Sequence, residues 1–451
     1  MENSDEDCRA VVSYSVNRRP RVKISVDFES QSATTKGKGI VAEIGVGFEK
    51  LLEELTTTFG EVGRHVVFGD PRFEAGPFHR EADLLRGEAL RYFTRLFAAG
   101  LTAEVEFHNP DYPNLTSFLT PWLNWGYPNP DGRYHWTMLS GEHTYRVWGN
   151  RGTHHLLDIE VWEGDLSNMN LCSPIGGYRH IYGGKTDLDI ADDGSFEVIL
   201  SREAHPGNWV PLPEQTGHIY IREWFYDLAT EQPGSYFIER VDATYPPPAP
   251  VAADYEAACR RLIDFLRSQP DFLQRGINMH YEAPEGTVAF PPNLLTMDSG
   301  REVAFRNQVY ARGTFECEPD EAIIMEVEPP KAQYWLFVLM SNFWEHYDRR
   351  GRQISINGSE AVLDSDGKFR AVISHTDPGV PNWLDTYGHV QGLVGGRYNW
   401  TETVPEPTLK RVKLAELFDH LPADTARITP EERQTVLRSR LINARRIGVD
   451  A

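Results

Sequence analysis

The chain has 451 residues, which at roughly 150 residues per domain suggests about three domains and a core that needs no disulfide or metal to hold it together. Asp and Glu outnumber Lys and Arg by 66 to 45, so the formal net charge is −21. Such a charge repels phosphate backbones and anionic lipid. We therefore expect neither a nucleic acid nor a membrane as a partner.

Cysteine usage and the first residues favour a reducing compartment. The four cysteines are too far apart for a CxxC metal knuckle and too few for a disulfide framework; they are Cys8, Cys172, Cys259 and Cys317. The chain begins MENSDEDCRA, with acidic residues where a secretory signal would carry positive charge before an apolar run. We expect a soluble, cytoplasmic protein.

The first hundred residues are predicted to be a tail followed by helices. Residues 1–36 read as a polar tail or edge segment, in which RVKISVDFES alternates like a strand. Residues 37–100 form a helical region, because apolar residues recur three and four positions apart over 40–58 and again over 78–99. We expect Gly100 to end the second helix as its C′ glycine.

A first β module is predicted over residues 101–245. Proline or glycine recurs every few positions near its start, and short alternating strands such as HHLLDIEVWEG and GHIYIREWFYD follow. On this interpretation Glu104, Glu106 and His108 alternate on one face of a strand. They could supply metal ligands together, but solvent exposure also explains them, and we expect no metal site.

A linker is predicted to separate this module from the next. Residues 246–284 begin with a proline-rich stretch, which acts as a semi-rigid spacer and cannot join a central strand. An amphipathic helix then covers 254–267, and Pro270 follows its end. This segment should connect two separate β modules.

The second β module is predicted over residues 285–413, with strands such as REVAFRNQVY, AQYWLFVLM and KFRAVIS. Residues 414–451 form a helical tail, in which Thr429 is an N-cap and Glu432 completes a capping box. The fold class is therefore mainly β with flanking helices (α+β), built on two related antiparallel β-sandwich-like modules.

An internal repeat relates the two modules. ADDGSFEVILSREAHPGNW at 191–209 matches DSDGKFRAVISHTDPGVPNW at 364–383 with one inserted residue. The match places Asn208 and Trp209 on Asn382 and Trp383. An arginine follows each Asn-Trp pair at a similar interval, Arg222 in the first module and Arg397 in the second. The repeated unit is a strand, a turn, and a return strand that ends in arginine.

The repeated turn has two interpretations. Its Asn can bond its own backbone while Trp covers the end of the sheet. Alternatively, Asn and Trp line the mouth of a cavity that the arginines face, because a guanidinium is costly to bury unless a carboxylate or an anionic ligand meets it. The strand GHIYIREWF also sets Tyr220 and Arg222 on one polar and aromatic face, as in a ligand-facing wall or an exposed strand. The predicted substrate-binding residues are Asn208, Trp209, Tyr220, Arg222, Asn382 and Trp383.

The second half carries a family resemblance. YWLFVLMSNFWEHYDRRGRQISINGSEAVL and the following DSDGKFRAVISHTDPGVPNWLDTYGH…GGRYNW resemble the C-terminal segment of the domain-of-unknown-function family twelve-fourteen. GYPNPDGRYHWTMLSGEHTYRVWGNRG is similar to the segment with which such proteins enter their first sheet. The resemblance covers roughly residues 325–402, and more weakly 125–240. It implies no reaction and no catalytic residues.

The sequence offers one acid–base candidate and no familiar cofactor motif. No P-loop, GxGxxG, HExxH or GxSxG occurs, and we expect no cofactor. Asp385 and His389 lie four residues apart in a glycine-rich loop, where a carboxylate that orients an imidazole makes a usable general base, although residues that cap turns look the same. The predicted catalytic residues are His389 as the base, Asp385 as its orienting group and Arg397 as the group that binds a negative charge.

Three functions are compatible with these observations. The first is a cofactor-independent enzyme of small-molecule metabolism that uses acid–base chemistry on an apolar or aromatic substrate. The second is a carbohydrate-binding or carbohydrate-active β-sandwich, in which Trp209, Trp383 and Tyr220 stack on sugar rings. The third is a non-catalytic binding partner. A small-molecule ligand and a homo-oligomer are both compatible with the sequence.

Overall fold

The structure is a computed structural model that describes residues 38–448 apart from 77, 118, 121, 166–172, 182–187, 282–290 and 299–307. The chain divides into two units, Met1–Gly47 and Phe48–Ala451, and the second is considered below. The predicted tail of 1–36 and the REVAFRN part of one predicted strand lie outside the described residues.

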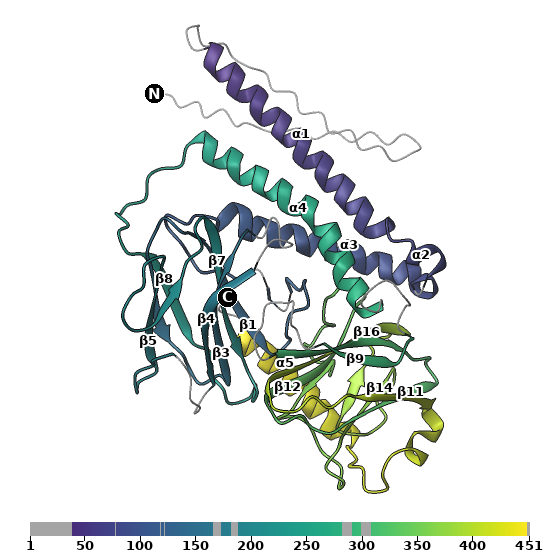
Figure 1. The fold of residues 1–451 in the computed structure, drawn as a ribbon. Coiled ribbons are helices and arrows are strands. Elements are labelled where there is room, and N and C mark those ends of the chain that lie inside the picture. The colour runs from purple at the N-terminus through teal and green to yellow at the C-terminus, as the bar shows by residue number, and fades with distance from the viewer. Residues whose placement is uncertain are drawn as a thin grey trace, which may run out of the picture. The chain divides into compact units, whose positions relative to one another are not determined.

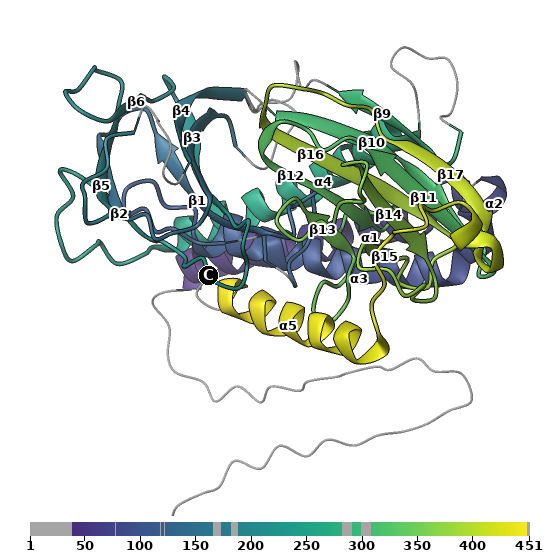
Figure 2. The ribbon, with the colours of Figure 1, turned by 90° about the horizontal axis from the view of Figure 1, so that it is seen from below.

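The described residues of the second unit contain two β modules, drawn side by side in Figure 2. The sheets of the first module have the strand orders β1-β7-β3-β4 and β6-β5-β2-β8, and those of the second β13-β12-β16-β10-β9 and β15-β14-β11-β17. In each module, apolar side chains from both sheets form one core. The prediction of a mainly β protein with flanking helices and two related β-sandwich-like modules is confirmed.

The strands have the following bounds. In the first module they are β1 (Gly132–Ser140), β2 (Tyr145–Asn150), β3 (Leu156–Glu163), β4 (Ser173–Ile181), β5 (Ser195–Ser201), β6 (Trp209–Pro211), β7 (Thr216–Trp224) and β8 (Ser235–Arg240). In the second they are β9 (Leu294–Asp298), β10 (Gln308–Glu316), β11 (Glu321–Val327), β12 (Ala332–Met340), β13 (Ser355–Asn357), β14 (Phe369–Ser374), β15 (Trp383–Asp385), β16 (Gln391–Thr401) and β17 (Thr408–Lys413).

The two modules share one topology. Strands β1 to β8 correspond in order to β10, β11, β12, β13, β14, β15, β16 and β17, and this assignment reproduces the neighbours of every strand except the additional edge strand β9. Even the exceptions to antiparallel pairing recur, because β6 pairs parallel to β5 and β15 pairs parallel to β14. The correspondence extends the repeat from one strand and its exit turn to both sheets.

The repeated asparagines hold equivalent positions. The Nδ2 atom of Asn382 donates to the carbonyls of Val362 and Arg370 at 2.6 and 2.9 Å, and its Oδ1 atom accepts from the backbone N–H of Val362 at 3.0 Å. Asn208 makes the same three bonds, each at 2.8 Å, to Asp189 and Glu197. These bonds use most of the capacity of an amide, so both side chains serve to connect the strand with the preceding loop.

The repeated tryptophans also have equivalent contacts. The indole N–H of Trp209 donates to the carbonyl of Ser201 at 3.2 Å, and that of Trp383 donates to the carbonyl of Ser374 at 3.1 Å. Trp383 is buried and Trp209 is half-buried. Each ring therefore covers the end of its own sheet, as the structural interpretation of the turn expects.

Helices cover one side of both modules (Figure 1). The long ones are α1 (Lys38–Phe68), α3 (Ala82–Gly100) and α4 (Ala252–Tyr281), and the short ones are α2 (Arg72–Ala75), η1 (His79–Glu81) and the π-helix η2 (Leu101–Glu106). The short helix η4 (Leu414–Asp419) lies apart from them and packs against β11 and β17. The buried faces of α3 and α4 pack with Trp136 and Met138 of β1 in a third core. No helix in the described ranges combines the length and the apolar character that a membrane crossing demands.

The α-helix ends at Gly100 as expected, but Gly100 is not the expected C′ glycine. Gly100 has helical backbone angles, φ −63° and ψ −41°, and the chain continues as η2. A Cβ atom at Gly100 would lie 2.7 Å from Phe265 and 2.9 Å from Leu262, so the glycine permits the close approach of α3 and α4. As a consequence, Glu104 and Glu106 lie on a helix and not on a strand.

The predicted end of the connecting helix before Pro270 is also wrong. Helix α4 continues through Pro270 to Tyr281. Leu273 and Ile277 beyond the proline are buried in the same core as Leu262 and Leu266 before it. Burial of this continuous apolar face outweighs the one backbone hydrogen bond that proline cannot make.

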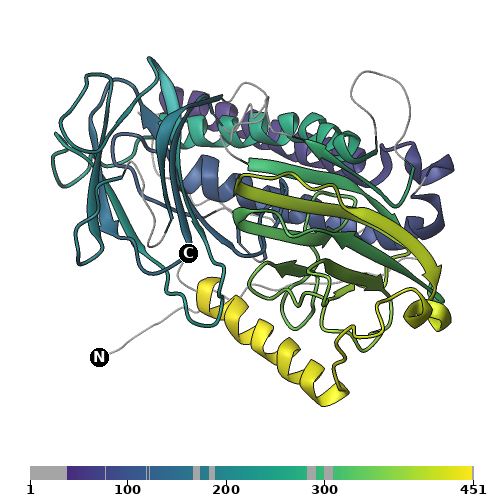
Figure 3. The same cartoon turned by 60° about the horizontal axis from the view of Figure 1, so that its bottom comes forward.

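The last helix, α5 (Pro430–Gly448), contacts both modules. Its capping box is confirmed, because Thr429 N–H donates to Glu432 Oε2 at 2.8 Å and Glu432 N–H donates to Thr429 Oγ1 at 3.2 Å. Arg440 pairs with Glu360 of the second module at 2.8 Å, and Arg446 donates to the carbonyl of Leu228 of the first. In Figure 3 this helix is the yellow one below the sheets.

The repeated asparagines give a matched pair of substitutions. Asn382→Ala should lower the free energy of unfolding by about 1 to 3 kcal/mol, because it leaves buried backbone groups without partners. Asn208→Ala should lower the free energy of unfolding by a smaller amount, because water can reach its half-buried site. Urea denaturation of the full chain measures both values. If both variants lose the same free energy of unfolding, burial does not determine how much each asparagine stabilises the fold.

Candidate functional site

The two repeated arginines occupy the same place in corresponding sheets. On β7, Arg222 lies directly opposite Tyr134 of β1 and Asp158 of β3. On β16, Arg397 lies directly opposite Tyr310 of β10 and Leu336 of β12. Directly opposite residues point to the same face of a sheet. The repeat therefore preserves an arginine–tyrosine pair and replaces an aspartate with a leucine.

The difference between Asp158 and Leu336 changes the electrostatics of the two arginines. Arg222 Nη2 lies 2.7 Å from Glu160 Oε2 and 3.2 Å from Asp158 Oδ2. The strand register gives Arg397 Leu336 and Val338 in the corresponding positions. Asp158 and Glu160 of β3 thus neutralise the guanidinium of Arg222, whereas β12 presents no carboxylate at the positions beside Arg397.

Arg397 is buried among aromatic rings. Only 4% of it is exposed, and its guanidinium carbon lies 4.6 Å from the ring centre of Tyr127, 5.5 Å from that of Tyr310 and 5.7 Å from that of Trp224. Its Nη2 atom donates to the carbonyl of Tyr127, and no carboxylate of a described residue forms an ion pair with it. Cation–π contacts stabilise the charge but do not neutralise it. Trp224 belongs to β7 of the first module, so its contact with Arg397 joins the two modules.

Two further arginines, Arg312 and Arg222, lie close to Tyr310. Burial raises the pKa of the Tyr310 hydroxyl, and the charges of Arg397, Arg312 and Arg222 oppose that rise. The guanidinium of Arg312 lies 4.9 Å from the Tyr310 ring. We call Tyr127, Arg222, Tyr310, Arg312 and Arg397 the arginine–tyrosine cluster.

A neutral histidine from α4 adjoins the cluster. Burial, together with the charge of Arg312, lowers the pKa of His280 to about 3. Its Nδ1 atom lies 3.3 Å from the carbonyl of Gly313, which fixes the proton on Nδ1. Its Nε2 atom is buried and has no hydrogen bond to a described residue. The ring centre lies 5.7 Å from that of Tyr127, so an unused acceptor borders the site.

Two aromatic residues at the cluster have unusual backbone angles. Tyr127 has φ 62° and Trp344 has φ 63°, both in the left-handed region that residues with a Cβ seldom adopt. They contact each other, since Tyr127 N–H donates to the carbonyl of Trp344 at 2.9 Å. Such angles cost about 1 to 3 kcal/mol each and are often found at functional sites. Here they place the Tyr127 ring against Arg397.

A buried polar turn joins the modules beside the cluster. The Tyr334 hydroxyl donates to Asp131 Oδ2 at 3.0 Å, and Asn357 Nδ2 donates to the same oxygen at 2.9 Å. Burial and the charge of Glu360 raise the pKa of Asp131 to about 6, although these two hydrogen bonds and Arg349 favour the carboxylate. The turn connects the entrance of β1 with strands β12 and β13.

The predicted general base lies in a different environment. His389 stacks on Tyr347 with ring centres 5.0 Å apart, and its Nε2 and Nδ1 atoms lie 3.2 and 3.8 Å from carboxylate oxygens of Glu88 and Glu81. Burial opposes the charged form, but these two carboxylates prevail and raise the pKa of His389 to about 9. A histidine that is already protonated at pH 7 cannot accept a proton, so this environment does not favour a general base.

The three predicted catalytic residues do not form one group. Asp385 accepts hydrogen bonds from Arg352 at 2.7 Å and from the N–H of Tyr387 at 2.8 Å, and neither bond involves His389. Arg397 lies six residues along β16 from the strand's first residue, about 20 Å from the end near His389. The catalytic roles stay predictions, and Arg397 alone belongs to the arginine–tyrosine cluster.

The predicted substrate-binding residues are also distributed over several places. Tyr220 shares the face of Arg222 and makes edge contacts with Trp162 and His218. Asn208 lines a surface hollow of about 750 Å³ beside Trp148 and Glu197. Asn382, Trp383 and Trp209 are engaged in the sheet ends described above. Of the six residues, Arg222 is the one that lies in the cluster.

Sequence reasoning missed most of the cluster. Tyr127, Arg312 and His280 carry no motif, and His280 falls in the part of α4 that was expected to follow the helix. The repeat itself could have identified Tyr310. When it is extended to β1 and β10, GRYHW aligns with QVYAR and Tyr134 aligns with Tyr310.

Comparisons with known proteins connect the chain to one family. The family model described as "Protein of unknown function (DUF1214)" matches residues 136–227 and 316–392, one segment in each module. The crystal structure of an uncharacterised protein from Burkholderia cenocepacia is 26% identical with a TM-score of 0.69, and the match covers 82% of this chain and 98% of that chain. The VPA0106 protein from Vibrio parahaemolyticus is 10% identical with a TM-score of 0.40, covering 72% and 98%. No curated protein matches at a significant level.

The environment of His389 predicts a pH dependence of stability. Because the folded pKa of about 9 exceeds the ordinary 6.5, the ion pairs contribute fully below pH 6.5 and their contribution disappears as the pH rises through 9. Denaturant unfolding should show that the stability difference between the native chain and His389→Gln falls by up to about 3 kcal/mol over this range. Taking the difference removes the contributions of other groups such as Glu345, whose pKa burial raises to about 7.

The control for this experiment is His205→Gln, which removes an exposed histidine whose Nδ1 atom contacts the carbonyl of Pro206. Its difference from the native chain should not change with pH. A constant difference for His389→Gln as well would contradict a charged His389.

Proposed function

The DUF1214 family model matches one segment of each module, and we propose that the chain is a cofactor-independent acid–base enzyme that binds a small anionic molecule at Arg397. The observation that carries this proposal is the contrast between the two arginines of the repeat. Arg222 is neutralised by Asp158 and Glu160, whereas Arg397 is equally buried and faces Leu336 in place of a carboxylate.

A bound anion would compensate this charge. A buried guanidinium is costly unless a carboxylate or similar group meets it, and its planar donors fit a carboxylate in a bidentate geometry. The Nε atom of Arg397 has no hydrogen bond to a described residue and could be one of the two donors. The rings of Tyr127, Tyr310 and Trp224 suit a ligand with an aromatic or apolar body.

Acid–base chemistry is proposed for the groups that adjoin Arg397. His280 presents a neutral Nε2 atom, and the Tyr127 hydroxyl also lacks a hydrogen bond to a described residue. A bound anion would favour protonation of His280, because its negative charge offsets both burial and the charge of Arg312. Arg397 would then stabilise negative charge that develops on the substrate while Nε2 accepts a proton.

The location and one alternative function are also proposals. The described cysteines, Cys259 and Cys317, are free thiols, which supports a reducing compartment such as the cytoplasm. Carbohydrate binding has some support at the surface hollow, which Trp148 lines. Trp148 stacks on Phe237 with ring centres 5.6 Å apart, and Phe237 is 53% exposed. The non-catalytic alternative would use the same anion site without turnover.

Thermal unfolding with probe ligands tests the proposal. Benzoate should raise the melting temperature of the native chain in a saturable way, while neutral benzamide should not. Arg397→Met should weaken benzoate binding at least tenfold. Leu336→Asp should have the same effect, because it gives Arg397 the partner that Asp158 gives Arg222.

The matched control is Leu336→Asn, which is similar in size and polarity to the aspartate variant but uncharged, and which should keep benzoate binding. Circular dichroism without ligand confirms that each variant is folded. If benzoate stabilises the native chain, Leu336→Asp and Arg397→Met equally, the anion does not bind at Arg397. If glucose or cellobiose stabilises the chain and benzoate does not, the carbohydrate alternative replaces this proposal.

A further inference from the structure

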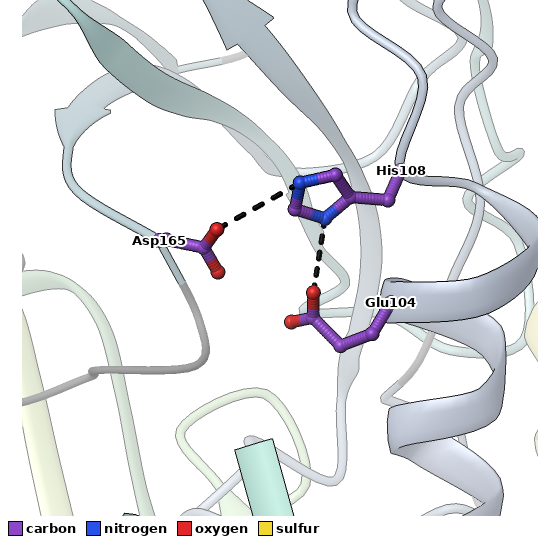
Figure 4. A group of neighbouring side chains, drawn as sticks. All are labelled: Glu104, His108 and Asp165. Carbon is purple, nitrogen blue, oxygen red and sulfur yellow. Dashed lines mark ion pairs between the residues drawn. The ribbon is translucent and has the colours of Figure 1, made fainter. Parts of the chain in front are cut away.

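A second group of ionisable side chains lies at the end of β3, away from Arg397. Glu104 comes from the π-helix η2, His108 follows that helix, and Asp165 follows β3 (Figure 4). His108 Nδ1 lies 2.9 Å from Glu104 Oε2, and its Nε2 lies 3.7 Å from Asp165 Oδ2. One ligand atom from each residue lies within 4.8 Å of the others.

The continuation of α3 past Gly100 creates this arrangement. Glu104 lies in the added helical turn and His108 lies two residues beyond its end, where the chain brings its Nδ1 atom to 2.9 Å from Glu104 Oε2. Asp165 arrives from the adjacent sheet, where β3 ends at Glu163. The strand interpretation of this segment put Glu104, Glu106 and His108 in a row, and it gave no reason to expect Asp165 beside them.

Glu104 is a buried carboxylate whose one ion pair with a described residue is the contact with His108. It is 0% exposed, and neither of its carboxylate oxygens is hydrogen-bonded to a described residue. Arg261 directs its Nε atom at the backbone carbonyl of Glu104, 3.1 Å away, and not at the carboxylate. A negative charge in this position needs a cation that the side chains around it only partly provide.

We propose that Glu104, His108 and Asp165 bind a divalent transition-metal ion of the Zn²⁺ type. Two ligands of a tetrahedral zinc ion lie about 3.3 Å apart, which is close to the separation of His108 Nδ1 and Glu104 Oε2. Asp165 lies on the Nε2 side of the imidazole, so its side chain, which is 26% exposed, supplies the third ligand by turning toward the Nδ1 side. Water completes the coordination from that more open side.

The ligand set indicates the class of metal. An imidazole nitrogen combined with two carboxylates suits Zn²⁺ and related first-row ions. Mg²⁺ and Ca²⁺ take oxygen ligands, so the histidine disfavours them. The site is independent of the proposed function, because β3 ends five residues beyond Asp158, about 17 Å along the strand from the arginine pair.

Metal titration of the full chain tests this proposal. After treatment with a chelator and its removal, isothermal titration calorimetry with Zn²⁺ should find a site that is lost, or weakened at least tenfold, in His108→Ala and in Asp165→Asn. The Asp165 variant alters a partly exposed side chain, and circular dichroism verifies that both variants fold. Co²⁺ bound to the native chain should give the visible absorption of a four-coordinate ion.

The matched control is His143→Ala. His143 Nε2 lies 2.9 Å from Asp111 Oδ1, so this variant removes another histidine–carboxylate pair, and it should bind Zn²⁺ as the native chain does. Zn²⁺ binding of equal stoichiometry and affinity in the native chain and in both site variants would overturn the proposal. Tighter binding of Mg²⁺ than of Zn²⁺ would overturn the metal class.

Discussion

A buried positive charge at the junction of two β modules is the constraint around which this part of the molecule is arranged. Arg397 belongs to the second module, but its guanidinium lies against Trp224 of the first and against Tyr127 of the segment that leads into the first. Removing the charge from water costs free energy that the cation–π contacts return only in part. The unusual backbone angles of Tyr127 and Trp344 are a second cost at the same place.

Duplication explains why such a charge is present. Two copies of one eight-stranded topology place an arginine and a facing tyrosine at the same register, and the copies differ in the third strand. Asp158 and Glu160 pair with Arg222, so this arginine has its counter-charge within its own sheet. In the second module Leu336 takes the place of that aspartate beside Arg397. The same repeat retained the asparagine bonds at the sheet ends, so these positions stabilise the modules while the arginine positions have diverged.

The sequence was sufficient for the architecture and insufficient for the site. Alternation, turn residues and the repeat predicted two β modules, and Thr429 with Glu432 predicted a cap that is present. Gly100 and Pro270 each have the local signature of a helix end, but helical structure continues past both of them. The packing of α3 on α4 explains why. His389 looked like a base because Asp385 was near in sequence, whereas its actual partners, Glu81 and Glu88, come from 301 or more residues away in the chain.

Helix α5 adds a mechanical consequence. Arg446 holds the carbonyl of Leu228, while Arg433 and Arg440 are bonded to Asp377 and Glu360 of the other module. Helix α5 thus connects the two modules across their junction. The sheets that meet at Arg397 cannot separate unless these contacts break. On the proposed function, a ligand would therefore reach Arg397 by rearrangement of individual side chains and not by separation of the modules.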